Sequence, residues 1–232
     1  MKLREIFNHF IGLFYPNVCC TCGNNLVIGE EVVCMRCLYR LPRTNYHLKP
    51  DNPVEQRFWG KARVEHGTAF CFFIKGSDFR KALHALKYHG GKEIGYVFGK
   101  YAACDIAESE NFRNFDYIVP VPLHPTKFQM RGYNQSACIA DGLAAILHAP
   151  VETTNLYRAV ANPTQTKKSI VERWENAQGI FAVHDAQLFA QKRLLLVDDV
   201  LTTGATLIAC IEAIHSVTPT ARISVFTLAV AV

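Results

Sequence analysis

The sequence lacks an uncharged apolar run of the roughly 18 residues that a membrane-spanning helix needs, so we expect no stable membrane insertion. Its apolar N-terminus, MKLREIFNHFIGLFYP, is interrupted by Asn8 and His9 and precedes no small-residue cleavage site, unlike a signal peptide. Apolar side chains recur there at helical spacing, which predicts an amphipathic helix on the protein's own body or, as the alternative, on a membrane surface. Without an export signal we expect a cytoplasmic protein whose cysteines stay reduced.

Two nucleotide-binding patterns are also missing. The chain contains neither G-x-x-x-x-G-K nor G-x-G-x-x-G, which argues against a P-loop and a dinucleotide site. We find no internal repeat and no low-complexity tract. Half of the 232 residues are hydrophobic and 19% are charged, a composition typical of a soluble globular protein. The net charge of +5 permits contact with nucleic acid or phosphorylated ligands without requiring either.

Cysteines are abundant near the N-terminus, in the segment CCTCGNNLVIGEEVVCMRC. Cys19 and Cys22 form one C-x2-C pair, and Cys34 and Cys37 form a second. Each pair presents two thiolates from one turn, and two facing pairs complete a tetrahedral Zn2+ site. Four thiolates leave no open coordination position, so this zinc would be structural. The alternatives are clustering by chance and a ligand role for Cys20, whose position does not make the same spacing.

We divide the chain into three parts: 1–45, with the N-terminal helix and a zinc-binding ribbon; 46–63, a linker or hood; and 64–232, one larger domain. The VIGEEVV segment between the cysteine pairs is interpreted as a short hairpin with a turn at its glycine. Three arginines follow the second pair, and they fit either contact with nucleic acid or an ordinary solvated face: Arg36, Arg40 and Arg43.

Residues 64–232 alternate strand and helix patterns. Several strands are apolar throughout, which is typical of an α/β fold with a parallel sheet covered on both faces. In such folds, ligands bind beyond the carboxyl ends of the strands. The expected strands are 67–74, 116–122, 151–160, 179–183, 193–200 and 222–230. The expected helices are two within 78–107, separated at Gly90–Gly91, then 136–149 and 204–217.

The stretch LLLVDDVLTTGAT runs from an apolar strand into two acids and then into a turn and a helix. Backbone amides of 202–206 would converge at the helix N-terminus as a phosphate cradle, with Thr203 as the cap. Asp198 and Asp199 would repel that phosphate, but they could accept hydrogen bonds from sugar hydroxyls or bind Mg2+ through its waters. A ribose 5-phosphate fits this arrangement, and the alternative is a plain strand-to-helix turn with a capping Asp.

VDDVLTTGAT resembles the phosphoribosyl diphosphate (PRPP) signature of type I phosphoribosyltransferases. Further stretches narrow the resemblance: LHALKYHG, IVPVPLHPTKFQMRGYNQS and the pattern Gln165, Arg173, Asn176, Phe181. Together with the four-cysteine module they resemble the ComF family of bacterial competence proteins, which is amidophosphoribosyltransferase-like. The resemblance covers nearly the whole chain and implies a type I phosphoribosyltransferase domain behind a zinc ribbon.

The resemblance also implies roles for individual residues. Asp198 and Asp199 would contact the ribose, Arg131 would neutralise the diphosphate, Arg173 would lie in a loop that closes over PRPP, and Lys87 is a weaker candidate. The implied 5-phosphate loop is Thr202, Thr203, Gly204, Ala205 and Thr206. The strand end implied to receive the diphosphate is Pro120, Val121, Pro122, Leu123 and His124.

Two functions of different class follow. The first is Mg2+-assisted transfer of phosphoribose from PRPP to a nitrogen acceptor, with release of diphosphate. The alternative is a non-catalytic protein that handles single-stranded DNA during DNA uptake, with a vestigial or regulatory PRPP site. The sequence has no basic patch interleaved with aromatic residues of the kind on which single strands stack. It identifies neither the acceptor nor the oligomeric state.

Overall fold

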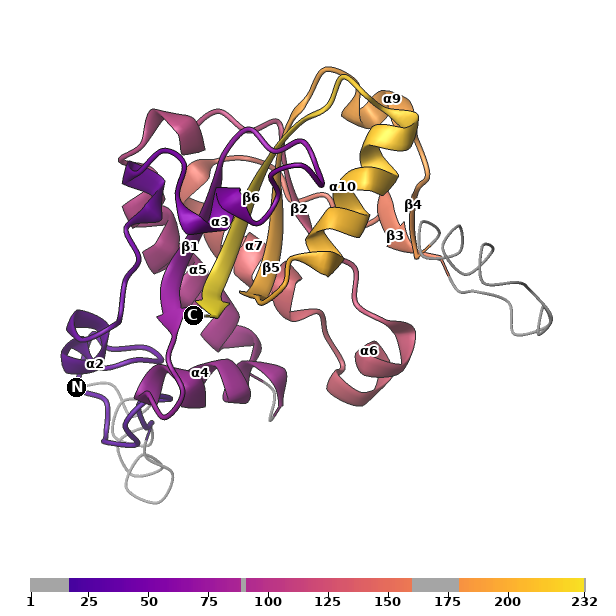
Figure 1. The fold of residues 1–232 in the computed structure, drawn as a ribbon. Coiled ribbons are helices and arrows are strands. Elements are labelled where there is room, and N and C mark those ends of the chain that lie inside the picture. The colour runs from indigo at the N-terminus through magenta and orange to yellow at the C-terminus, as the bar shows by residue number, and fades with distance from the viewer. Residues whose placement is uncertain (1–16, 89–90, 160–179, 232) are drawn as a thin grey trace.

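A computed structural model describes residues 17–88, 91–159 and 180–231. The predicted N-terminal helix and Arg173 lie outside these residues. The central sheet has four parallel strands in the order β1, β6, β5, β2 (Figure 1). These strands are β1 (Gly67–Phe73), β2 (Tyr117–Pro120), β5 (Arg193–Leu201) and β6 (Arg222–Ala231).

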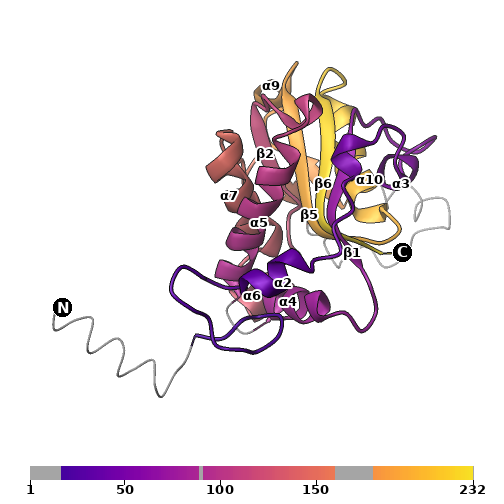
Figure 2. The same ribbon diagram turned by 90° about the vertical axis from the view of Figure 1, so that its left-hand side faces the viewer.

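Helices cover both faces of the sheet, as an α/β fold requires (Figures 1 and 2). One face carries α4 (Asp78–Lys87), α5 (Lys92–Ile106) and α7 (Gln135–Leu147), and the other carries α9 (Ala186–Phe189) and α10 (Ala205–Val217). The run 194–197 is fully buried because its side chains alternate between these two layers. The strands expected at 67–74, 116–122, 193–200 and 222–230 are therefore confirmed.

The expected strand at 151–160 is mostly wrong. Only β3 (Leu156–Arg158) forms, and it pairs antiparallel with β4 (Phe181–Val183) outside the parallel sheet. Val151 alone contacts the main sheet, through a single bridge to Ile118. Two glutamate-anchored bonds interrupt the segment, because Glu152 Oε1 accepts from the amides of Thr154 and Asn155.

Helices α5 and α7 pack closely because glycines lie at their crossing. A Cβ atom on Gly142 would lie 2.1 Å from the Tyr96 carbonyl oxygen, and one on Gly99 would lie 2.4 Å from the Ile139 oxygen. Both distances are far inside van der Waals contact with backbone atoms, so no larger side chain fits without a shift of one helix. The close packing of α5 against α7 fixes the position of the amino end of α7.

The cysteine-rich module has little regular structure. Within its described residues, from 17 onward, the helix α2 (Met35–Tyr39) begins directly after Cys34. The predicted hairpin in VIGEEVV is wrong: the chain turns at Gly29 with φ of 92°, and the Glu30 amide donates to the Val27 oxygen at 3.0 Å, but no strand ladder follows. Glu30 instead accepts from the amide of Met35 and ties the turn to α2.

The predicted linker or hood packs against the sheet. It contains the 3-10 helix η1 (Tyr46–Leu48) and the short helix α3 (Pro53–Gln56). Val54 and Phe58 are 0% and 1% exposed, so this segment belongs to the core under α10. Two further short helices, which the sequence did not predict, are η2 (Glu110–Phe112) and α6 (Pro125–Arg131). No described helix is long and apolar enough to cross a membrane.

Candidate functional site

The two acids lie in β5 just beyond its last pairing with β2, where β5 still pairs with β6. Asp198 Oδ1 accepts hydrogen bonds from Ser136 Oγ at 3.0 Å and from the Asp199 amide at 2.9 Å. Asp199 Oδ2 forms an ion pair with Lys87 Nζ at 3.0 Å. The end of β2 lies beside them because Pro120 pairs with Val197. The strand register therefore places the turn after β2 next to the acid pair.

The electrostatic state of the acid pair follows from its burial. Burial and the adjacent charge of Asp199 raise the pKa of Asp198 to about 7, although the Asp199 amide, Ser136 and Lys87 oppose the rise. Without a ligand the pair therefore holds a proton close to neutral pH. A ligand that supplies hydroxyl donors or a cation would favour the fully ionised pair.

The loop after β5 forms a small cavity of about 40 Å³. Gly204 has a φ of 84° and occupies the N-cap position of α10, which begins at Ala205. The prediction of Thr203 as the cap is wrong by one residue, and its Oγ1 accepts only a long bond of 3.4 Å from the Ala205 amide. The lining includes all five predicted loop residues: Thr202, Thr203, Gly204, Ala205 and Thr206. Their amides lie at the N-terminus of a 13-residue helix, a favourable place for an anion.

A cavity of about 210 Å³ lies between the acid pair and the turn after β2. The structure brings nine of the predicted residues to it: Lys87, Val121, Pro122, Leu123, His124, Arg131, Asp198, Asp199 and Thr206. Pro120 is not among them, since it lies inside the sheet as the last residue of β2. The fold thus brings residues that are distant in the sequence to one cavity.

Sequence reasoning missed four polar residues that line the same cavity: Lys127, Gln135, Ser136 and Arg158. Gln135 is 2% exposed, and its Oε1 accepts from Arg131 Nη1 at 2.7 Å. Gln135 Nε2 and Arg131 Nε are buried donors without a partner among the described residues. Unsatisfied buried donors are uncommon and costly, so this pair favours an acceptor-rich ligand. The RGYNQS motif was the available signal for Gln135 and Ser136.

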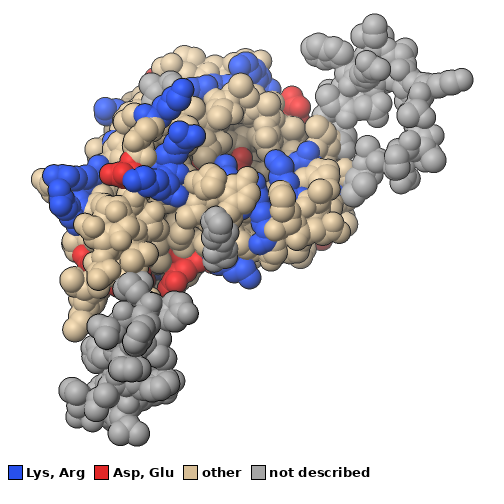
Figure 3. All heavy atoms as spheres, turned by 90° about the horizontal axis from the view of Figure 1, so that it is seen from below, with Lys and Arg blue, Asp and Glu red and all other residues tan. Residues whose placement is uncertain are grey.

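Figure 3 shows the face on which the strands of the sheet end. Lys and Arg side chains gather on this face around a hollow in which acidic atoms are visible. Four of the cations that line the larger cavity come from three different parts of the chain: Lys87 from α4, Lys127 and Arg131 from α6, and Arg158 from β3. Positive charge around a small acidic floor suits a ligand with phosphates at its edges and hydroxyls at its centre.

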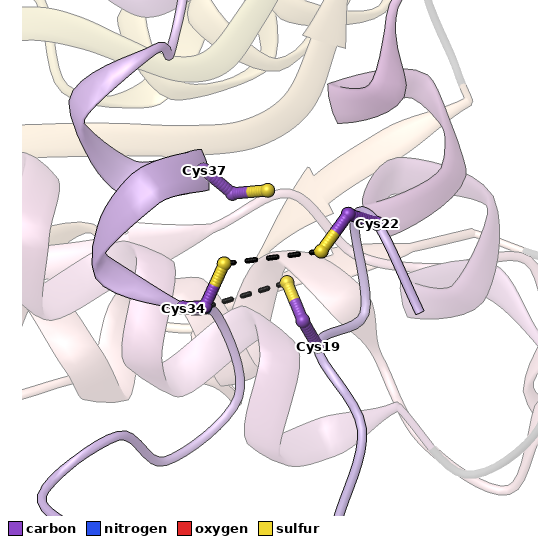
Figure 4. Close-up of side chains that lie close together, drawn as sticks. All are labelled: Cys19, Cys22, Cys34 and Cys37. Atoms are coloured by element: carbon purple, nitrogen blue, oxygen red, sulfur yellow. Dashed lines mark hydrogen bonds between the residues drawn. The ribbon is translucent and has the colours of Figure 1, made fainter. Parts of the chain in front are cut away.

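The predicted cysteine site is a separate centre (Figure 4). The sulfur atoms of Cys19, Cys22, Cys34 and Cys37 all lie within 4.8 Å of one another. A tetrahedral Zn2+ with bonds of about 2.3 Å places its sulfurs about 3.8 Å apart, and Cys22 and Cys34 lie 3.8 Å apart. Four cysteines with this spacing fit zinc. Cys20 is not in the cluster, and its sulfur lies 3.6 Å from Thr21 Oγ1.

Backbone amides support the thiolates in this centre. The Cys34 amide donates to Cys19 Sγ at 3.3 Å. Burial opposes ionisation of Cys19, but hydrogen bonds from the amides of Cys22, Cys34 and Thr21 outweigh it and lower its pKa to about 6. The loop therefore favours the thiolate of Cys19, whereas burial and the neighbouring thiols raise the pKa of Cys34 and Cys37.

Comparisons with known proteins bear on the fold and the family of this chain. A family model described as a phosphoribosyl transferase domain matches residues 134–231. DNA utilization protein YhgH of Salmonella typhimurium is 30% identical over 205 residues, which cover 84% of this chain and 88% of that protein. Competence protein ComFC of Bacillus subtilis is 28% identical over 216 residues, which cover 88% of this chain and 86% of that protein.

Among solved structures, a glutamine PRPP amidotransferase from Bacillus subtilis aligns with a TM-score of 0.45 and 17% identity. The alignment covers 63% of this chain and 30% of that one. The domain match and the parallel sheet define a protein with a type I phosphoribosyltransferase fold preceded by a four-cysteine cluster. The chain belongs to the ComF family, whose members here include the DNA utilization and competence proteins.

Proposed function

We propose that this chain binds PRPP with Mg2+ and transfers phosphoribose to a nitrogen acceptor. The observation that carries the proposal is the meeting of three parts at adjoining cavities: the acid pair 198–199, the loop 202–206 and a group of cations. Thr206 and Asp198 line both cavities, so one ligand can occupy the two together. A 5-phosphate, a ribose ring and a diphosphate match these three parts in order.

Each part has a distinct role in this proposal. The loop amides hold the 5-phosphate, and Asp198 and Asp199 accept hydrogen bonds from the ribose hydroxyls. Lys87, Lys127 and Arg131 neutralise the diphosphate. Lys87 forms an ion pair with Asp199 in the ligand-free chain, so its ammonium is already within reach of the cavity. Arg173 stays a prediction for the closing loop.

The transfer step breaks the bond between ribose C1 and the diphosphate oxygen, and the electron pair leaves with diphosphate. The acceptor nitrogen forms the new bond to C1 and loses its proton to solvent. Mg2+ would supply charge neutralisation at the diphosphate when bound. It usually binds through one or two carboxylates together with phosphate oxygens and waters, which fits Asp198 and Asp199 beside a phosphate cavity. This chain's cations stabilise the charge that develops on the leaving group.

Calorimetric titration of PRPP with Mg2+ into the purified chain tests this proposal. Wild type is expected to bind saturably, and Asp198→Asn/Asp199→Asn to lose binding. Glu212→Gln, an exposed residue further along α10, removes a charge without touching the site and should bind like wild type. No binding by wild type, or equal binding by the double variant, would refute the assigned site. Diphosphate release across a panel of amines and nucleobases then tests transfer itself.

A second candidate function is the handling of single-stranded DNA without catalysis. Two observations favour it: the relatives are named DNA utilization and competence proteins, and Lys and Arg side chains gather on the face in Figure 3. Binding through phosphates should weaken steeply as salt increases. Fluorescence anisotropy with a labelled oligonucleotide, measured at about 50 and about 200 mM salt, tests this function. No retention at low salt would count against this function.

We also propose that the four cysteines hold a structural Zn2+. Four thiolates saturate a tetrahedral ion and leave no position for a substrate. The ion would then stabilise the module, while the chemistry belongs to the cavity beside the acid pair. Elemental analysis of the purified protein should find about one zinc per chain.

A further inference from the structure

We propose that Arg57 is a positioning residue that holds the phosphate loop in its binding conformation. The inference rests on the proposed function, because it assigns a role in the same site. Arg57 lies in the segment 46–63, outside both the acid pair and the loop, and it lines neither cavity. Its effect on a ligand would therefore act through the loop.

The helix α3, which directly precedes Arg57, is anchored to the sheet by hydrogen bonds. Asn52, which is 3% exposed, caps α3 by accepting from the amides of Val54 and Glu55. Its Nδ2 donates to the Gly67 carbonyl at 2.9 Å, at the start of β1. Glu55 Oε1 in turn accepts from the Gly67 amide at 3.0 Å. Helix α3 is thus tied to the sheet on both sides of the Gly67 peptide.

The Arg57 guanidinium donates hydrogen bonds to two backbone carbonyls. Arg57 Nη1 donates to the Thr202 oxygen in the phosphate loop, and Nη2 donates at 2.9 Å to the Ala231 oxygen at the end of β6. A planar fork with fixed donor directions is suited to bridging two acceptors, which a lysine cannot do in the same way. Arg57 therefore links the loop to the last strand of the sheet.

The orientation of the Thr202 carbonyl has a direct consequence for the loop. In a trans peptide, the carbonyl oxygen and the following N–H point in opposite directions. With the Thr202 oxygen bound to Arg57, the Thr203 N–H is directed away from Arg57. Thr203 lines the small cavity, and its amide donates to no group among the described residues. Arg57 thereby keeps one phosphate-binding amide available and one carbonyl turned away from the anion.

Phe58 supports the same loop from below. It is 1% exposed, and its Cε1 lies 3.8 Å from the position of a Cβ on Gly204, the residue with positive φ in the loop. Arg57 and Phe58 are consecutive, so one short segment contacts both the start of the loop and its glycine. Preorganised donors bind an anion without the loss of loop entropy that a mobile loop would incur.

The test compares Arg57→Lys and Arg57→Gln with wild type. The first keeps the charge and loses the fork, and the second loses both. Matched controls are Arg63→Lys and Arg63→Gln, at an exposed arginine that makes no side-chain hydrogen bond to the described residues. Ribose 5-phosphate and Mg-diphosphate are titrated separately. We expect both Arg57 variants to weaken ribose 5-phosphate binding about tenfold, while diphosphate binding stays unchanged.

A second measurement needs no ligand. Hydrogen exchange of the amides of 202–206 should accelerate in both Arg57 variants and in neither control, with the melting temperature used to confirm folding. Wild-type affinity in Arg57→Lys together with loss in Arg57→Gln would overturn the proposal, because charge alone would then suffice. Unchanged loop exchange would also overturn it. If wild type binds no PRPP, the proposed function fails, while the exchange result still decides whether Arg57 holds the loop.

Discussion

The cysteine module and the acid site both bring charged groups together, but the first does so with little regular structure and the second on a buried strand. The described part of the module, residues 17–45, has one five-residue helix and exposes large apolar side chains, among them Ile28 at 98% and Tyr39 at 92%. The acid pair follows four residues of β5 that are fully buried, Leu194 to Val197. The proposed metal would add to the stability of the first region, whereas the second is built on a buried sheet and needs no ligand to form.

The two regions also differ in how charge repulsion is relieved. The four cysteine sulfurs lie within 4.8 Å of one another, and the proposed Zn2+ would neutralise their thiolates. Asp198 and Asp199 are relieved within the chain, by Lys87 and by a proton on Asp198 near neutral pH. The proposed zinc would leave no open position in the first site, whereas the second could exchange these partners for a ligand.

The largest expected effect is on the metal centre. Cys22→Ser should lose the zinc, and residues 17–41 should unfold while the parallel sheet stays folded. Structural zinc sites contribute on the order of 10 kcal/mol in small modules, far more than any single contact. Elemental analysis and hydrogen exchange measure the two outcomes. Cys20→Ser is the control and should keep its zinc; equal zinc in Cys22→Ser would contradict the assignment.

The next effect tests the packing behind the acid site. Gly142→Ala should lower the free energy of unfolding by about 3 kcal/mol, because the new Cβ would meet the Tyr96 carbonyl at 2.1 Å. Denaturant unfolding measures the change. Ala145→Ser, on the exposed side of α7, should change stability by about 0.5 kcal/mol. If both variants matched wild type, the close approach of α5 and α7 would be wrong.

A smaller effect concerns pH. Asp198 titrates at about 7 in the folded chain and at about 4 when unfolded, so the folded state binds the extra proton between these values. The free energy of unfolding should therefore fall as the pH rises from about 4 to 7, by on the order of 1–3 kcal/mol. Asp198→Asn cannot ionise, and its curve should be flatter. Parallel curves for the two proteins would rule out the raised pKa.

The smallest effect on stability is expected at Lys87. Its ion pair with Asp199 is partly exposed, so Lys87→Met should change the free energy of unfolding by about 0.5 kcal/mol. The same variant removes a cation that lowers the pKa of Asp198, so the pH dependence of stability should move to higher pH. Lys87→Arg should keep the wild-type curve. A loss of several kcal/mol would instead make Lys87 a structural residue.

Predictions from the sequence were accurate where a pattern is local. The buried run of β5, the helix after the TTGAT turn and the two cysteine pairs all follow from periodicity or spacing within a few residues. Predictions were wrong where a local pattern was compatible with more than one structure. Gly29 forms the expected turn without a hairpin, and 151–160 forms one short strand because Glu152 binds the neighbouring amides.

The sequence by itself determined which side chains are available as metal ligands, as acceptors of hydrogen bonds from hydroxyls, or as cations for phosphates. Only the tertiary structure decided which of them meet. Gln135 and Arg158 reach the acid pair through the crossing of α7 and the position of β3, and Arg57 reaches the phosphate loop across 145 residues of sequence. Such contacts depend on the order and register of parallel strands, which non-local hydrogen bonds and packing select and which no short motif encodes.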